Sequence, residues 1–210
     1  MKRIVFERIG KYSFTIRPTV FNPRDFESSE AFISYVNTME LEGKNILDMG
    51  AGSGVVSIFA ASKGAICTAV DINPVAVKCL NENIIQNHFT KKITAVESDL
   101  FESKLLDNKK FDIIFCMNAI NHVHDIEKSF DNLISCANKN AHIIVTIDAH
   151  NHPTFKYLFR LLPGDILHPH QYDLNEYQKM LTQRGCELLG TELLKHEFFF
   201  DHYLLVARKM

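Results

Sequence analysis

Several features that would assign this chain of 210 residues to other classes of protein are missing. No apolar stretch approaches the roughly 20 residues of a transmembrane helix, and Met1–Glu7 lacks the apolar core of a signal peptide. There is no basic run, and the formal net charge is −2, which gives no support for nucleic-acid binding along an extended surface. The composition leaves room only for a small basic patch. We therefore expect neither a membrane nor a nucleic acid as partner.

Paired cysteines are also missing. The chain has five cysteines, an odd number, and none forms a C-x-x-C pair. This usage is typical of buried free thiols in a reducing compartment, so we expect a cytoplasmic protein. The cysteines are Cys67, Cys79, Cys116, Cys136 and Cys186.

No linker, repeat or low-complexity segment divides the chain. From Asn45 onward, strand-like and helix-like runs alternate, which is typical of a doubly wound α/β sheet. Strands are predicted over Asn45–Met49, Ile66–Val70, Ile93–Glu97, Phe111–Cys116 and Ala141–Ile147. Helices are predicted over Ser53–Ser62, Pro74–Asn87, Asp125–Ala137 and Leu174–Arg184.

The first forty residues have a different pattern. Apolar and polar residues alternate over Lys2–Arg8 and Tyr12–Arg17, which predicts a short hairpin. Prolines keep Pro18–Pro23 extended, and Asp25–Thr38 reads as an amphipathic helix. Residues 1–40 are therefore predicted to be an extension that packs on a domain of residues 41–210. This extension either covers a ligand or only packs against the core.

The most informative segment is Asn45–Gly54, an apolar run that leads into glycines at every second position. Such a turn needs residues without a Cβ, so that the backbone can take positive φ and a ligand can approach it. Asp71 lies about 20 residues beyond the first glycine, where an acidic side chain can reach a ribose hydroxyl. The pattern predicts a cofactor that contains adenosine.

The third glycine of a dinucleotide fingerprint is missing, because Val55 stands in its place. A carboxylate, Asp48, stands two residues before Gly50, and it would repel a pyrophosphate but favour a cation. S-adenosylmethionine (SAM) has no phosphate and carries an ammonium group and a sulfonium centre, so it suits this acidic mouth.

Leu47–Gly54 closely resembles the first motif of class I SAM-dependent methyltransferases, and the resemblance extends through Asp71 and Ser98–Asp99 over about residues 40–210. It implies that Asp48 and the glycine loop hold the methionine part, Asp71 the ribose and Asp99 the adenine amino group. The full set predicted beside the cofactor is Asp48, Gly50, Ala51, Gly52, Gly54, Asp71, Ile72, Asp99, Leu100 and Asn118.

Simpler interpretations of these residues remain. The glycine segment could be only a turn, Asp71 could cap the helix that begins near Pro74, and Asp99 could be a loop acid. The cofactor hypothesis depends on all three falling at the ends of successive strand-like runs.

Two further β-rich runs, Cys186–Leu194 and Phe198–Ala207, read as an antiparallel pair. Class I methyltransferases end in such a pair, with the last strand inserted antiparallel into the sheet. The resemblance therefore implies a doubly wound, seven-stranded, mostly parallel sheet with an antiparallel C-terminal pair.

The methyl acceptor should lie outside the carboxyl ends of the strands. Met117–Asp125 follows the fourth predicted strand there, and Asn118-Ala-Ile-Asn121 lacks the prolines of aminomethylating family members. The run instead resembles the L-x-H-V-x-D pattern of small-molecule methyltransferases. This implies that Asn118 lines the cofactor and His122 faces the site. Alternatively, Asp125 is the N-cap of the next helix, which is the interpretation we favour for it, and His122 packs beneath it.

A second candidate segment, Asp148–Pro153 with His168–Tyr172, follows the fifth predicted strand. Its histidines could be solvent-exposed, could supply a base near neutral pH, or could bind a metal through two His-x-His pairs. We predict no metal and choose His122, His150 and His170 as catalytic candidates. The apolar stretch Thr154–Leu167 predicts a helix that closes over an apolar acceptor.

These observations together predict a SAM-dependent methyltransferase acting on a small, partly apolar metabolite. A methyltransferase of ribosomal RNA or protein is the alternative from another substrate class, because Phe21–Arg24 is loosely reminiscent of such enzymes. A SAM-binding module without transfer activity is the non-enzymatic alternative.

Overall fold

The computed structural model describes residues 3–23, 27–99, 109–153 and 172–210. A seven-stranded sheet forms its centre, in the order β5-β4-β3-β6-β7-β9-β8. Five neighbouring strands, β5, β4, β3, β6 and β7, run parallel to one another. Strand β9 lies between β7 and β8 and is antiparallel to both. The strands are β3 (Asn45–Met49), β4 (Ile66–Asp71), β5 (Ile93–Glu97), β6 (Phe111–Cys116), β7 (Ala137–His150), β8 (Cys186–His196) and β9 (Phe200–Lys209).

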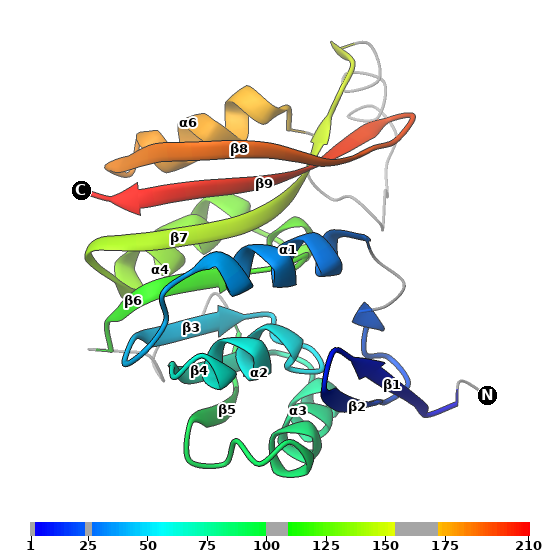
Figure 1. Cartoon of the computed structure of the whole chain (residues 1–210). Helices are drawn as coiled ribbons and strands as arrows, with labels where there is room; N and C mark the ends of the chain where they lie inside the picture. The colour runs from blue at the N-terminus through cyan, green and yellow to red at the C-terminus, as the bar shows by residue number, and fades with distance from the viewer. Residues whose placement is uncertain (1–2, 24–26, 100–108, 154–171) are drawn as a thin grey trace.

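Helices cover both faces of this sheet (Figure 1). One face carries α1, α2 and α3, and the other carries α4 and α6, so the predicted doubly wound architecture with its antiparallel C-terminal pair is confirmed. The helices are α1 (Glu27–Thr38), α2 (Val55–Ser62), α3 (Pro74–Gln86), α4 (Ile126–Cys136) and α6 (Leu174–Thr182), with a short 3-10 helix, η3 (Ile120–His122).

Local sequence explains where these helices begin. Asn73 caps α3 by accepting a hydrogen bond from Val75 N, and Pro74 has the fixed φ that suits a first turn. Asp173 and Glu176 form a reciprocal capping box at α6. Asp125 caps α4 by accepting from Lys128 N at 3.0 Å, as predicted.

Strand β7 is longer than predicted at both ends. The prediction followed the apolar run Ala141–Ile147, but the strand continues to His150, because each residue from His142 to His150 has a partner on β9. Asp148 and His150 therefore lie in a strand and not, as we expected, in the loop that follows it.

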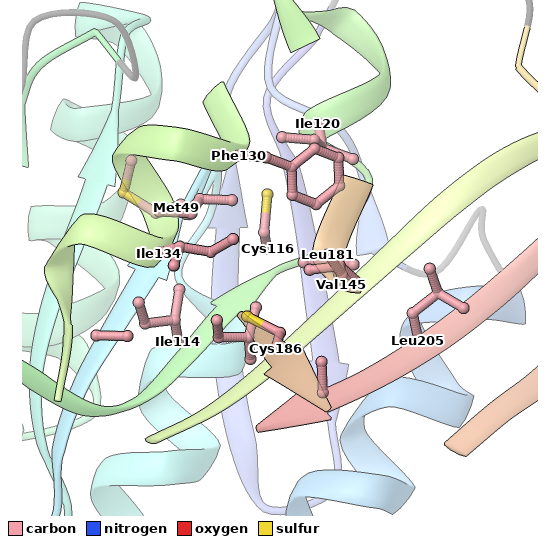
Figure 2. Packing of buried hydrophobic residues seen from close by; sticks show 14 of the residues in the cluster. Met49, Ile114, Cys116, Ile120, Phe130, Ile134, Val145, Leu181, Cys186 and Leu205 are labelled. Atoms are coloured by element: carbon pink, nitrogen blue, oxygen red, sulfur yellow. The ribbon is translucent and has the colours of Figure 1, made fainter. Parts of the chain in front are cut away.

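Each face of the sheet has its own apolar core. Figure 2 shows the core beneath α4 and α6, where Phe130 and Leu181 pack on Ile114 and Val145 of the sheet. The five cysteines are buried free thiols, as predicted. Within the described residues, no helix has both the length and the apolar character that crossing a membrane requires.

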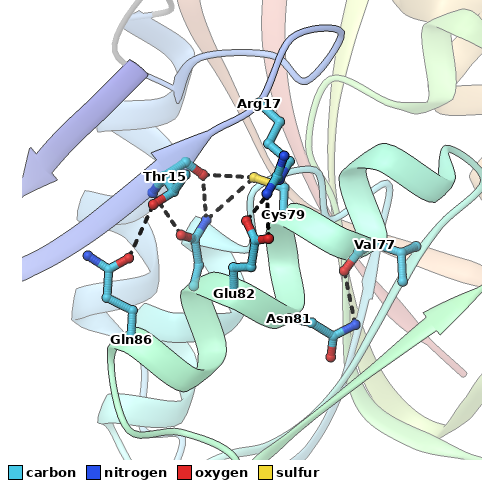
Figure 3. A network of polar contacts seen from close by, with 8 residues as sticks. Thr15, Arg17, Val77, Cys79, Asn81, Glu82 and Gln86 are labelled. Atoms are coloured by element: carbon cyan, nitrogen blue, oxygen red, sulfur yellow. Dashed lines mark hydrogen bonds and ion pairs between the residues drawn. The ribbon is translucent and has the colours of Figure 1, made fainter. Parts of the chain in front are cut away.

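The N-terminal residues form a separate two-stranded hairpin, β1 (Val5–Ile9) with β2 (Tyr12–Ile16), close to its predicted position. The hairpin is tied to α3 (Figure 3): Arg17 forms two hydrogen bonds with Glu82, and the buried Asn83 amide binds both the N–H and the carbonyl of Thr15. The hairpin and α1 pack on the α2–α3 face. The proposed boundary at residue 40 stays a prediction.

Candidate cofactor and acceptor site

The glycine loop joins β3 to α2 at the carboxyl edge of the parallel strands. Gly50, Gly52 and Gly54 all have positive φ, of 72°, 55° and 84°. A Cβ on Gly50 would lie 2.3 Å from Ala119 Cβ, and one on Gly54 would lie 2.3 Å from Leu80 Cδ1. A Cβ on Gly52 would meet only Gly50 O, at 4.0 Å. Gly50 is therefore required by internal packing, and at Gly54 the Leu80 side chain would have to move, whereas Gly52 borders open space that a ligand can approach.

Asp71 ends β4 beside this loop. Its Oδ2 accepts a hydrogen bond from Gly52 N at 2.8 Å, and its Oδ1 accepts from Asn73 N at 2.9 Å. The alternative that Asp71 caps α3 is wrong, since Asn73 is the cap. Asp71 instead positions the loop, and its neighbour Ile72 is 63% exposed.

Asp48 lies beneath the loop rather than at its surface. It is buried, and its Oδ2 accepts hydrogen bonds from Ser57 N at 3.1 Å and from Ser57 Oγ at 2.6 Å. Burial raises the pKa of Asp48 to about 6, against the opposing effect of the Ser57 hydrogen bonds. The predicted acidic mouth is therefore a buried carboxyl group under the loop, with Asp71 as its half-buried companion.

The predicted adenine end of the site lies at the end of β5. Asp99 is half-buried there, and Ser98 N donates to the backbone carbonyl of Asp71 at 3.1 Å, so the ends of β4 and β5 are held together. Leu100, which we also predicted beside the cofactor, lies outside the described residues.

Asn118 follows β6 and has a left-handed backbone with φ of 50°. Its N–H donates to Thr146 Oγ1 at 2.7 Å, and the Thr146 hydroxyl donates back to Asn118 Oδ1 at 2.9 Å. The next residue, Ala119, lies against Gly50. The structure thus brings Asn118 to the same place as the glycine loop.

His122 is exposed at the end of η3, and its ring stacks on Phe21 with centroids 6.0 Å apart. This differs from the alternative in which His122 packs beneath α4. Phe21 belongs to the segment after β2, and Thr19 O of that segment accepts from Asn73 Nδ2 at 3.3 Å. The segment therefore crosses from the Asp71 side of the site to the His122 side.

His150, the second catalytic candidate, is 5% exposed, and its ring lies 4.3 Å from that of Phe200. His152 is exposed. His168, His170 and the predicted helix Thr154–Leu167 lie outside the described residues. Among the residues that are described, no three potential ligands are grouped as a metal would require.

Sequence reasoning missed several residues of this edge. Ser57 and Thr146 are hydroxyl residues on a helix and a strand, and their spacing along the chain does not indicate their partners. It also missed the pairing of His202 on β9 with Asp148 on β7, since 54 residues separate them; His202 Nδ1 lies 2.5 Å from Asp148 Oδ1. Only the antiparallel register of β9 on β7 brings them together.

Comparison with known proteins agrees with this geometry. The sequence model of the methyltransferase domain family matches residues 24–190. The chain belongs to this family. Magnesium protoporphyrin IX methyltransferase of Synechocystis, solved with bound S-adenosylhomocysteine, has a similar fold, with a TM-score of 0.68 and 20% identity over 90% of this chain and 89% of that chain.

Two curated methyltransferases match parts of the sequence. The ubiquinone biosynthesis O-methyltransferase of Glaesserella parasuis is 34% identical over 149 residues, which cover 62% of this chain and 60% of that protein. A Methanocaldococcus jannaschii protein with the provisional name protein N5-glutamine methyltransferase is 37% identical over 100 residues, covering 47% and 46%. This methyltransferase chain therefore spans about three fifths or less of the length of both relatives.

The predicted membership of the class I SAM-dependent methyltransferases, the predicted fold and SAM as cofactor are thereby confirmed. The residues fit this cofactor: Gly52 borders open space, Ile72 offers an exposed apolar side chain, and two carboxyl groups lie beneath and beside the loop.

Proposed function

We propose that this protein transfers a methyl group from SAM to a small, partly apolar metabolite. The observation that carries the proposal is the glycine loop with Asp48 beneath it and Asp71 beside it, at the carboxyl edge of a methyltransferase sheet. The likeness to an O-methyltransferase of ubiquinone biosynthesis favours a hydroxyl oxygen as the acceptor atom.

In this proposal the cofactor supplies an activated methyl group, and the chain binds and aligns it. Asp71 accepts hydrogen bonds from the ribose hydroxyls, Asp99 accepts one from the adenine amino group, and Ile72 packs on the adenine. Leu100, outside the described residues, stays a predicted cofactor residue. The loop Gly50–Gly54 and Asp48 hold the methionine part, where a negative charge favours the ammonium and sulfonium groups.

The acceptor lies beside Asn118 in this account, between the ends of β6 and β7. Alignment of the acceptor with the methyl group and removal of water are the main requirements of the transfer. His122 and His150, with His170 outside the described residues, are proposed to line this side. A histidine of this edge takes the proton when the acceptor must lose one.

Transfer of labelled methyl groups tests the proposal. Methyl-labelled SAM is incubated with the protein and a cell extract, and the products are separated by size. We expect label among the small molecules. Label in RNA or protein would assign the chain to the macromolecular alternative, and no transferred label with intact SAM binding would leave a binding module.

Protein methylation is the second candidate, because the N5-glutamine methyltransferase relative is 37% identical over 100 residues. Against it, Asn118-Ala-Ile-Asn121 lacks the two prolines that mark aminomethylating enzymes.

The proposal includes a cytoplasmic location, which the five free thiols support.

A further inference from the structure

Asp148 lies on β7, the strand next to the one that Asn118 follows, and His202 lies on β9, one strand further. His202 of β9 is directly opposite Asp148 of β7. Asp148 comes two residues after Thr146, so both side chains point to the same face of the sheet. Two steps along one strand and one strand across place His202 about 8 Å from the Asn118–Thr146 pair.

The two nitrogens of the His202 ring have different surroundings. Nδ1 lies 2.5 Å from Asp148 Oδ1, whereas Nε2 is buried and has no hydrogen-bond partner. Glu197 Oε2 lies 3.5 Å from Nε2, at ion-pair distance when the ring is protonated. An imidazole that donates from Nδ1 presents a lone pair at Nε2. Buried polar atoms almost always have a hydrogen-bond partner. The Nε2 lone pair has none, and a hydroxyl group of a bound molecule would supply the missing donor.

The charges around His202 favour its protonated form. The hydrogen bond that His202 donates to Asp148 is the largest cause of the raised pKa of His202, and the charge of Glu197 adds to it, while burial acts against both. Lys195 pairs with Glu197 at 2.8 Å. His196 and Asp201 pair with each other at 2.6 Å, and they point to the opposite face because strand residues alternate.

We propose that His202 is the proton acceptor for methyl transfer to an acceptor hydroxyl, with Asp148 as the residue that positions it. This rests on the proposed function. His202 Nε2 takes the hydroxyl proton while the oxygen bonds to the methyl carbon. The carbon–sulfur bond breaks, and its electron pair stays on the sulfur. Asp148 stabilises the imidazolium, which later releases the proton to water.

The acceptor reaches Nε2 once the Glu197 side chain moves aside. Glu197 lies between β8 and β9, and its side chain is 45% exposed, so it has room to turn outward. Glu197 therefore adjusts the basicity of His202 without having to touch the reacting atoms.

The test uses the full-length protein, methyl-labelled SAM and a deproteinised small-molecule extract as the source of acceptor, across pH 5.5 to 9. We expect His202→Gln to lower turnover by about 10²–10⁴-fold, with SAM affinity and the midpoint of unfolding preserved. Turnover of the wild type should rise with pH through the raised pKa of His202. Glu197→Gln should move that rise to lower pH, an effect that a purely structural role would not produce.

His196→Gln is the control, because it removes another histidine–carboxylate pair, a more exposed one, from the same hairpin, and it should leave the pH profile unchanged. Wild-type turnover in His202→Gln, or an unmoved profile in Glu197→Gln, would overturn the assignment while leaving the proposed function intact. If the rise of turnover with pH disappeared in His122→Gln or His150→Gln instead, that histidine would be the proton acceptor. A wild type that transfers no label would remove both proposals.

Discussion

Asp48 is a buried carboxyl group whose negative charge lowers the stability of the fold. Its pKa is raised from an ordinary 3.8 to about 6 by burial, so folding favours the protonated form. The contribution of protonated Asp48 to the free energy of unfolding is fully present below about pH 4 and is lost as pH rises through about 6. Between these two limits, the free energy of unfolding falls by roughly 3 kcal/mol.

Asp48→Asn keeps an uncharged acceptor for Ser57 and removes the buried charge. We expect the free energy of unfolding at pH 7.5 to increase by about 1–3 kcal/mol, and its decline between pH 4.5 and 7.5 to become smaller. Urea denaturation at both pH values measures this.

The same substitution should weaken SAM binding at pH 7.5, because a negative charge near a cationic ligand is lost. Asp112→Asn is the control: Asp112 lies at the amino end of β6, at the opposite edge of the sheet, so SAM affinity should not change. Equal pH dependence of stability in Asp48→Asn and wild type would contradict the account.

Alanine substitutions in the glycine loop should have different effects at Gly50 and at Gly52. Gly50→Ala should lower the free energy of unfolding by about 2–4 kcal/mol, because φ is 72° and the new Cβ meets Ala119 Cβ at 2.3 Å. Gly52→Ala has only the backbone cost of about 1–2 kcal/mol, but its methyl group would occupy the space left for the ligand. Both variants are measured by urea denaturation and by calorimetric titration with SAM. Gly50→Ala should mainly lose stability, and Gly52→Ala should mainly lose SAM affinity. The reverse order would refute this division.

At the scale of elements, Asn83 connects three parts of the chain. Its buried side chain binds Thr15 N and Thr15 O of the hairpin and Ser53 O of the glycine loop. Asn83→Ala removes all three hydrogen bonds, and of the three groups Thr15 O keeps a second donor, Cys79 Sγ, so we expect a loss of about 2–3 kcal/mol in the free energy of unfolding. Arg17→Met removes only a partly exposed ion pair with Glu82 and should cost about 1 kcal/mol or less. Urea denaturation ranks the two, and a larger loss in Arg17→Met would contradict this picture.

Elements with a strong local pattern were predicted well, and their partners were not. Strands β3, β5 and β6 have the predicted bounds, because each is a short apolar run. The extension of β7 to His150 depends on pairing with β9, which local hydrophobicity does not report. For the same reason, the sequence identified Asp48 as a nearby charge but did not indicate its burial against Ser57.

For the whole molecule, the carboxyl edge of one sheet collects residues from nearly every part of the chain. The glycine loop, Asp71, Asn118 and the Asp148–His202 pair come from five strands or their ends. The motifs near the first three parallel strands were readable because cofactor binding needs particular residue types at short spacing. The proposed acceptor side is assembled from segments far apart in the sequence, so only the strand topology shows which residues meet there.

The most direct test of the central claim is calorimetric titration of the protein with SAM and, separately, with NAD. We predict that SAM binds and NAD does not, and that Asp71→Ala weakens SAM binding by about 1–3 kcal/mol, or roughly 5- to 150-fold, through loss of a hydrogen-bonded carboxylate. Binding of NAD without SAM, or unchanged SAM affinity in Asp71→Ala, would contradict the account.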